Sequence, residues 1–125
     1  MRKLLILLVL ILIGPASWAQ SNPGTGQWLH DIWKSNQRVW NRTSTDQTMD
    51  GAHALEYQGF VMGATAVMAT ANWIAIPASS TSGQIFAIVG EYIDDHPEEW
   101  NLPAVQLVYR ALYAAWPGET ASPWK

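Results

Sequence analysis

Few side chains in this sequence could do chemistry, and they do not combine into a recognisable catalytic pattern. The sequence contains no cysteine, which excludes a thiol nucleophile. His53 and Glu56 are three residues apart and would share one face of a helix, but a metal site of this kind would need a second such pair. Asp94, Asp95 and His96 are consecutive, so a helix would point them in different directions. We therefore expect a protein that is not an enzyme and that holds no cofactor and no metal.

A recognition surface is the remaining kind of site, and two stretches are candidates for it. The corner Asp94–Asn101 contains four acidic residues together with Pro97 and Trp100. The loop Pro77–Ser82 carries hydroxyl side chains on a turn that its proline stiffens. Trp100 could anchor a partner or hold the corner on the core, and the sequence leaves both interpretations open.

Two predicted helices position these stretches. The first carries apolar residues at the i, i+4, i+8 spacing of one helix face. Ser80 or Thr81 caps its start, and Pro97 ends it. The second begins at Pro103, a favoured first-turn position for proline, and Pro117-Gly118 stops it. Their apolar faces are Ile85, Phe86, Val89, Tyr92 and Ile93 in the first helix, and Ala104, Leu107, Val108, Ala111, Leu112 and Ala115 in the second.

An earlier helix, capped by Thr25, is predicted to bury Trp28, Leu29, Ile32 and Trp33. It ends near residues 35–36 or continues through residues 39–40. If it continues, three basic residues align as a stripe along the helix. The stripe is either a solvated face or a contact for the acidic corner, and that contact could form within the chain or between two copies of it. This stripe consists of Lys34, Arg38 and Arg42.

The longest predicted helix runs from Gly51 to Trp73, with Asp50 as its cap. No charged residue occurs from residue 57 to residue 90, so a membrane span over residues 57–76 has to be considered. The segment is rich in Ala, Gly and Thr and lacks the Leu and Ile density of such spans, which favours a buried central helix. Gly59 and Gly63 share one face and are expected to admit the backbone of the helix at residues 104–115.

Residues 1–19 have the composition of a signal peptide, with cleavage expected after Ala19. Arg2-Lys3 precedes the ten apolar residues Leu4–Ile13. An uncleaved anchor is the alternative, but crossing the bilayer takes about 20 apolar residues. The mature chain, residues 20–125, is long enough for one domain, and we expect no stable membrane insertion of it.

The charge of the mature chain limits the class of partner. Without Arg2 and Lys3, five Lys and Arg remain against ten Asp and Glu, a formal charge of −5. A nucleic-acid partner needs the opposite sign, whereas solubility or a basic protein partner suits an acidic surface. Because no disulfide can form, the eight tryptophans, seven of them in the mature chain, are expected to strengthen the core.

The chain resembles the Rap/Tai-type immunity proteins, small exported helical proteins that protect bacteria from the peptidoglycan-cleaving amidase effectors of type VI secretion. The segment from Gln84 to Pro117 is the most specific part. The residues that carry the resemblance are Gly26-x-x-Leu29, Gly59-Phe60-Val61-x-Gly63, Ile76-Pro77, Thr81-x-x-Gln84-Ile85, Tyr92-Ile93-x-x-His96-Pro97-Glu98, Pro103-Ala104-x-x-Leu107-Val108-x-x-Ala111-Leu112 and Trp116-Pro117.

One departure from the family is that its members usually carry disulfide-forming cysteines. The positions that align with those cysteines are occupied here by Trp33, Tyr57, Ala75 and Gly118. The substitution is concerted, as if paired positions had changed together, and large aromatic side chains can occupy the space of a former bridge.

The resemblance implies an all-α, compact four-helix periplasmic domain that forms a homodimer. It would bind a cognate amidase effector and block the catalytic cleft sterically, as an amidase inhibitor. Gln84, His96, Pro97 and Ala104 would be structural. The candidate partner-binding residues are Ser79, Ser80, Thr81, Glu98, Glu99, Trp100 and Asn101.

A different role for the same fold is the alternative hypothesis. A periplasmic helical protein of this kind could bind another protein partner, as an acid chaperone does. It would then expose apolar surface when acidic residues of the corner are protonated. Those residues are Asp94, Asp95, Glu98 and Glu99.

Overall fold

The computed structural model describes residues 22–124, and its helices confirm the all-α, four-helix fold. The predicted signal peptide, residues 1–19, lies outside the described residues. A short 3-10 helix, η1, connects the last two helices. The elements in order are α2 (Gly26–Trp40), α3 (Gln47–Thr70), α4 (Ser82–Asp95), η1 (Pro97–Glu99) and α5 (Ala104–Ala115).

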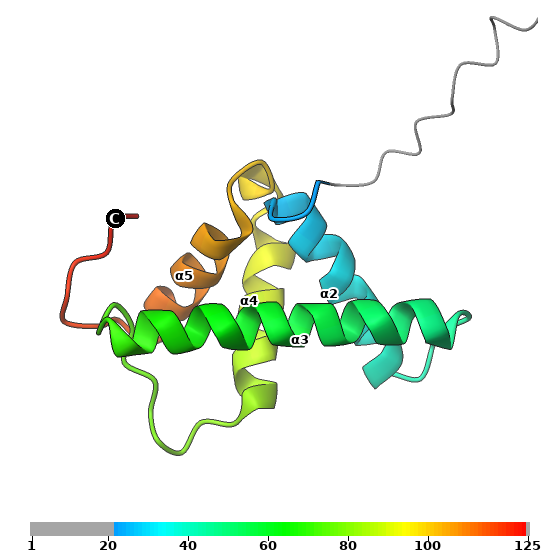
Figure 1. Ribbon diagram of the computed structural model, residues 1–125, viewed down its shortest axis with the longest axis horizontal. Coiled ribbons are helices and arrows are strands. Elements are labelled where there is room, and N and C mark those ends of the chain that lie inside the picture. The colour runs from blue at the N-terminus through cyan, green and yellow to red at the C-terminus, as the bar shows by residue number, and fades with distance from the viewer. Residues whose placement is uncertain (1–21, 125) are drawn as a thin grey trace, which may run out of the picture.

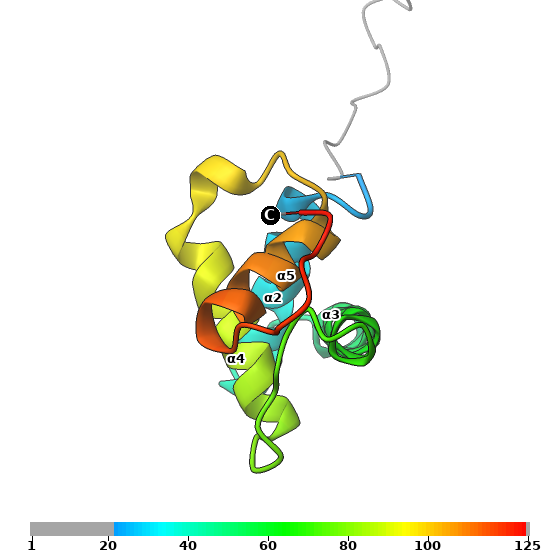
Figure 2. The same ribbon diagram turned by 90° about the vertical axis from the view of Figure 1, so that its left-hand side faces the viewer.

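Helix α3 lies across the other three helices (Figure 1). Seen along its axis, it stands on one side of the group formed by α2, α4 and α5 (Figure 2). The core lies where the four helices meet, and its most deeply buried apolar side chains come from all of them. They include Leu29, Tyr57, Val61, Val89, Ile93, Leu107, Val108 and Leu112.

The predicted caps of α2 and α4 are confirmed. Thr25 Oγ1 accepts a hydrogen bond from the backbone N–H of Trp28. Thr81 forms a capping box, in which its hydroxyl accepts from the Gln84 N–H while the Gln84 side chain accepts from the Thr81 N–H. Helix α2 continues through Trp40, which decides between the two ends that the sequence allowed.

The predicted start of the long helix is wrong by one turn. Helix α3 begins at Gln47, and its N-cap is Asp46 instead of Asp50. Asp50 lies inside the helix because Arg38 of α2 binds its carboxylate with both Nε and Nη2, at 2.9 and 2.7 Å. Hydrogen bonds from Arg38 and then from Ser44 hold the pKa of Asp50 well below its usual range.

Within residues 22–124, no helix combines the length and hydropathy that crossing a membrane requires.

The expected close approach at Gly59 and Gly63 is also wrong. A Cβ atom added at either glycine would meet no atom within 4 Å, because α3 turns its opposite face, with Tyr57 and Val61, toward the core. The close approach occurs at Gly90 of α4, where an added Cβ would overlap the ring of Trp33.

The positions that align with the family's cysteines come together in pairs. The ring centroids of Trp33 and Tyr57 are 5.2 Å apart. Ala75 and Gly118 belong to two short segments joined by an isolated antiparallel bridge. An added Cβ at Gly118 would overlap the backbone around Trp73, so this backbone requires glycine at position 118.

Alanine substitutions at three helical glycines should separate open from crowded positions. Gly59→Ala and Gly63→Ala should each raise the free energy of unfolding by up to about 1 kcal/mol, because alanine has the higher helix propensity and the space is open. Gly90→Ala should lower it by about 1–3 kcal/mol through overpacking against Trp33. Urea unfolding at low protein concentration measures all three, and stabilisation by Gly90→Ala would contradict the packing described here.

Candidate functional site

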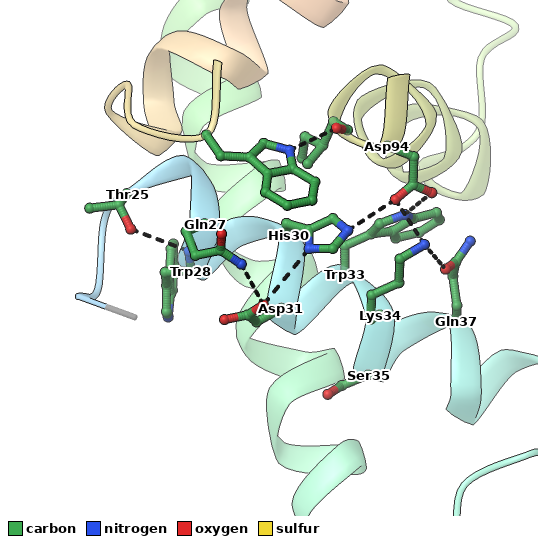
Figure 3. Close-up of polar contacts among 12 residues, drawn as sticks. Thr25, Gln27, Trp28, His30, Asp31, Trp33, Lys34, Ser35, Gln37 and Asp94 are labelled. Carbon is green, nitrogen blue, oxygen red and sulfur yellow. Dashed lines mark hydrogen bonds and ion pairs between the residues drawn. The ribbon is translucent and has the colours of Figure 1, made fainter. Parts of the chain in front are cut away.

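Asp94 joins the end of α4 to α2 through three side chains. Its carboxylate accepts a hydrogen bond from Trp33 Nε1 at 3.0 Å and forms an ion pair with Lys34 Nζ at 2.8 Å. His30 Nε2 lies 3.3 Å from the same carboxylate (Figure 3). His30 precedes Trp33 and Lys34 by three and four residues, so α2 presents all three on one side.

The surroundings of Asp94 favour its charged form. Burial raises the pKa of this carboxyl, but the interactions with Lys34, Trp33 and His30 outweigh burial, so its pKa lies below the usual value. Lys34 is therefore the member of the predicted basic stripe that meets the acidic corner. Arg38 binds Asp50 instead, and Arg42 lies beyond the end of α2.

Trp100 holds the corner against α2. Its ring stacks on His30 with centroids 4.0 Å apart, and its indole N–H donates to the Ile93 carbonyl at 2.9 Å. The carbonyls of Trp100 and Leu102 accept the first backbone N–H groups of α2, which a helix cannot satisfy internally. These contacts match the structural reading of Trp100.

Glu99 is also engaged within the molecule. Its carboxylate accepts from Arg110 Nη1 at 2.6 Å and from Tyr92 Oη at 3.0 Å, which ties η1 to α5 and α4. Burial, followed by the hydrogen bond to Glu99, raises the pKa of Tyr92. Of the candidate partner-binding residues in the corner, Glu98 and Asn101 are exposed.

The second candidate stretch is a protruding loop with fixed ends. The connection between α3 and α4 extends beyond the helices in both views (Figures 1 and 2). Ser79 and Thr81 are exposed and Ser80 is partly exposed. The Ser80 N–H donates to the Pro77 carbonyl at 3.0 Å, and the capping box fixes Thr81.

The structure does not bring the two predicted stretches together. The loop precedes α4 and the corner follows it, so they lie at opposite ends of this 14-residue helix, about 20 Å apart at 1.5 Å per residue. They are two surfaces, and a single compact partner feature would contact one of them. Within residues 22–124, no three histidine, aspartate or glutamate side chains gather as metal ligands would.

A cleft between α2 and α4, with a volume of about 450 Å³, is a feature that the sequence reasoning missed. Aromatic and amide side chains line it. The sequence offers one signal for this cleft: Trp40 follows Trp33 by seven residues, so the two share one helix face if the helix reaches residue 40. Because the sequence leaves the end of this helix open, it does not predict the cleft. The lining includes Trp33, Asn36, Trp40, Gln58, Gly83 and Phe86.

Acidification should weaken the attachment of the corner. Because the folded-state pKa of Asp94 is depressed below the unfolded value of about 3.9, its contribution to stability is present above that pH and is lost as pH falls through the folded-state pKa. Asp94→Asn should lower the free energy of unfolding at neutral pH by about 2 kcal/mol and flatten its decline in acid. The neighbouring exposed Asp95→Asn is the control, and equal pH profiles for the two variants would contradict this role of Asp94.

Comparison with known proteins agrees with the resemblance. Residues 25–118 match the family described as Rap1a immunity proteins, and the matched segment runs from the cap of α2 to the loop beyond α5, so it contains all four helices. No match is found among curated proteins or among solved structures. Because the match covers well over half of the sequence, the chain belongs to the family of Rap1a immunity proteins.

Proposed function

We propose that this protein acts in the periplasm as an immunity protein that binds a peptidoglycan amidase effector and blocks its catalytic cleft. The family match over residues 25–118 is the observation that carries the proposal. Inhibition by occlusion requires no reacting group on the inhibitor. It requires a rigid, protruding element that fits a concave site.

The loop that precedes α4 supplies such an element in this proposal. Ser79 and Ser80 offer hydroxyl donors and acceptors, and they stand on a turn whose ends are held by Pro77 and the Thr81 capping box. Ordering before binding reduces the conformational entropy that a flexible loop would lose in the complex. Ser79, Ser80 and Thr81 are therefore the proposed plug.

The corner contributes charge in this proposal. Glu98 and Asn101 are exposed, whereas Glu99 and Trp100 hold the corner in shape through Arg110 and His30. An exposed acidic corner on a molecule of net negative charge attracts a basic partner surface and accelerates encounter. Glu98 and Asn101 would act at the rim of the complex.

A homodimer is part of the proposal, and the outward face of α3 is the surface that suits it. Leu55, Met62 and Val67 are exposed by 70%, 37% and 63%, and Gly59 and Gly63 lie among them with open space above. The face is uncharged beyond Glu56, which lets two acidic molecules approach. A twofold dimer needs such a self-complementary patch.

Loop substitutions test the plug. The mature chain, residues 20–125, is used as bait in a periplasmic extract. The amidase that it recovers is then assayed for activity on purified peptidoglycan. Ser80→Arg should weaken inhibition by about tenfold or more, equivalent to 1.4 kcal/mol, because a long charged side chain prevents entry of the loop. Thr45→Arg, in the exposed loop before α3, is the matched control.

Two results would overturn parts of this proposal. Full inhibition by Ser80→Arg would exclude the loop as the plug while leaving the immunity function standing. Recovery of assorted unfolded proteins at low pH, with no amidase at any pH, would replace the immunity function with the chaperone alternative.

Light scattering with size-exclusion chromatography tests the dimer. Met62→Lys places two like charges in the proposed α3 interface and should convert a dimer into a folded monomer. Thr120→Lys adds the same charge on the exposed C-terminal segment and should leave the dimer intact. A monomeric wild-type chain, or a Met62→Lys dimer, would rule out this interface.

A further inference from the structure

The cleft between α2 and α4 is open because the two helices diverge on one side of the Trp33–Gly90 contact. Trp33 packs directly on Gly90, while the C-terminal end of α2 and the N-terminal end of α4 line the space beyond it. At Gly83, an added Cβ would meet only the Thr81 hydroxyl, at 3.9 Å. The volume of about 450 Å³ is in the range of small-molecule sites, roughly 300–1,000 Å³.

Two amide side chains in this cleft have unused hydrogen-bonding groups. Asn36 is only 7% exposed, and its Oδ1 accepts from Gln58 Nε2 at 2.8 Å. Among the described residues, this bond leaves Asn36 Nδ2 and Gln58 Oε1 without a partner. Neither group is among the fully buried polar atoms without a partner, so both can meet a ligand that offers one acceptor and one donor. A secondary amide has both.

The aromatic part of the cleft is exposed to an unusual degree. Trp40 has 81% of its surface accessible, although tryptophan gains more than most side chains from burial. Phe86 and Trp33 continue the apolar surface. Together they offer aromatic faces to the apolar side of a ligand.

The charge of the lining narrows the ligand class further. No Lys or Arg stands among the described residues that line the cleft, and Glu91 is the charged one, so an anionic ligand is disfavoured. Asn and Gln side chains donate and accept at once, which suits the hydroxyl groups of a sugar ring. A purely apolar protein anchor would leave these amides desolvated without partners.

We propose that the α2–α4 cleft binds a neutral N-acetylated sugar. The acetamido group meets Asn36 Nδ2 and Gln58 Oε1, and the ring lies against Trp40. This activity is separate from amidase inhibition and does not depend on the effector.

The test is a titration of the isotope-labelled exported chain with chitotriose, followed by nuclear magnetic resonance. Saturable shifts are expected at the side-chain amides of Asn36 and Gln58 and at the indole N–H of Trp40. Cellotriose, which has the same linkage without acetamido groups, should bind at least about tenfold more weakly. An N-acetylated dipeptide amide tests whether a peptide would serve instead.

Three variants make the test specific. Trp40→Ala alters an exposed residue and should fold; it should weaken chitotriose binding by about tenfold or more. Gln58→Met keeps the side-chain length but removes both polar groups and should weaken it similarly. Thr120→Ala, on the exposed C-terminal segment outside the cleft, should bind as the wild type does.

Four outcomes would overturn the proposal. They are the absence of saturable shifts, equal binding of chitotriose and cellotriose, tighter binding of the peptide than of the sugar, and shifts confined to residues outside the cleft. Each result is independent of whether the chain recovers an amidase.

Discussion

One side chain, Trp33, connects the three helices on which every candidate surface depends. Its ring packs on Gly90 of α4 and lies 5.2 Å from the ring of Tyr57 in α3, while its indole N–H donates to Asp94. It thereby combines apolar burial with a hydrogen bond to a charged group, two contributions that reinforce each other away from water. In a chain without cysteine, these non-covalent contacts connect the helices instead of disulfides.

The arrangement around Trp33 determines which surfaces remain exposed. On one side, the corner is fastened to α2 through Asp94 and Trp100, which leaves Glu98 exposed. On the other side, α2 and α4 separate to form the cleft beside Trp40. The loop with Ser80 extends from the other end of α4, and Leu55, Met62 and Val67 are exposed on the outer face of α3. Each surface can therefore have its own partner.

Local signals predicted the helices well, because periodicity, proline positions and the Thr81 cap act over a few residues. The prediction that Asp50 caps α3 is wrong because aspartate favours the N-cap equally at positions 46 and 50. The tertiary contact of Asp50 with Arg38 decides between the two positions. The expected close approach at the glycines of α3 is wrong because a sequence shows that two residues share a helix face but does not show what that face contacts. The cleft is not predicted for the same reason: it depends on contacts between helices, such as the hydrogen bond between Asn36 of α2 and Gln58 of α3.

Hydrogen–deuterium exchange of the chain with and without the proposed amidase partner is the measurement that addresses the plug itself. If the loop plugs the catalytic cleft, exchange should be slower in the complex for the loop and first turn of α4, around Ser79, Ser80 and Gly83, because their backbone amides would be buried. Protection confined to the corner at the other end of α4, around Glu98 and Asn101, with the loop unchanged, would show that the loop is not the plug.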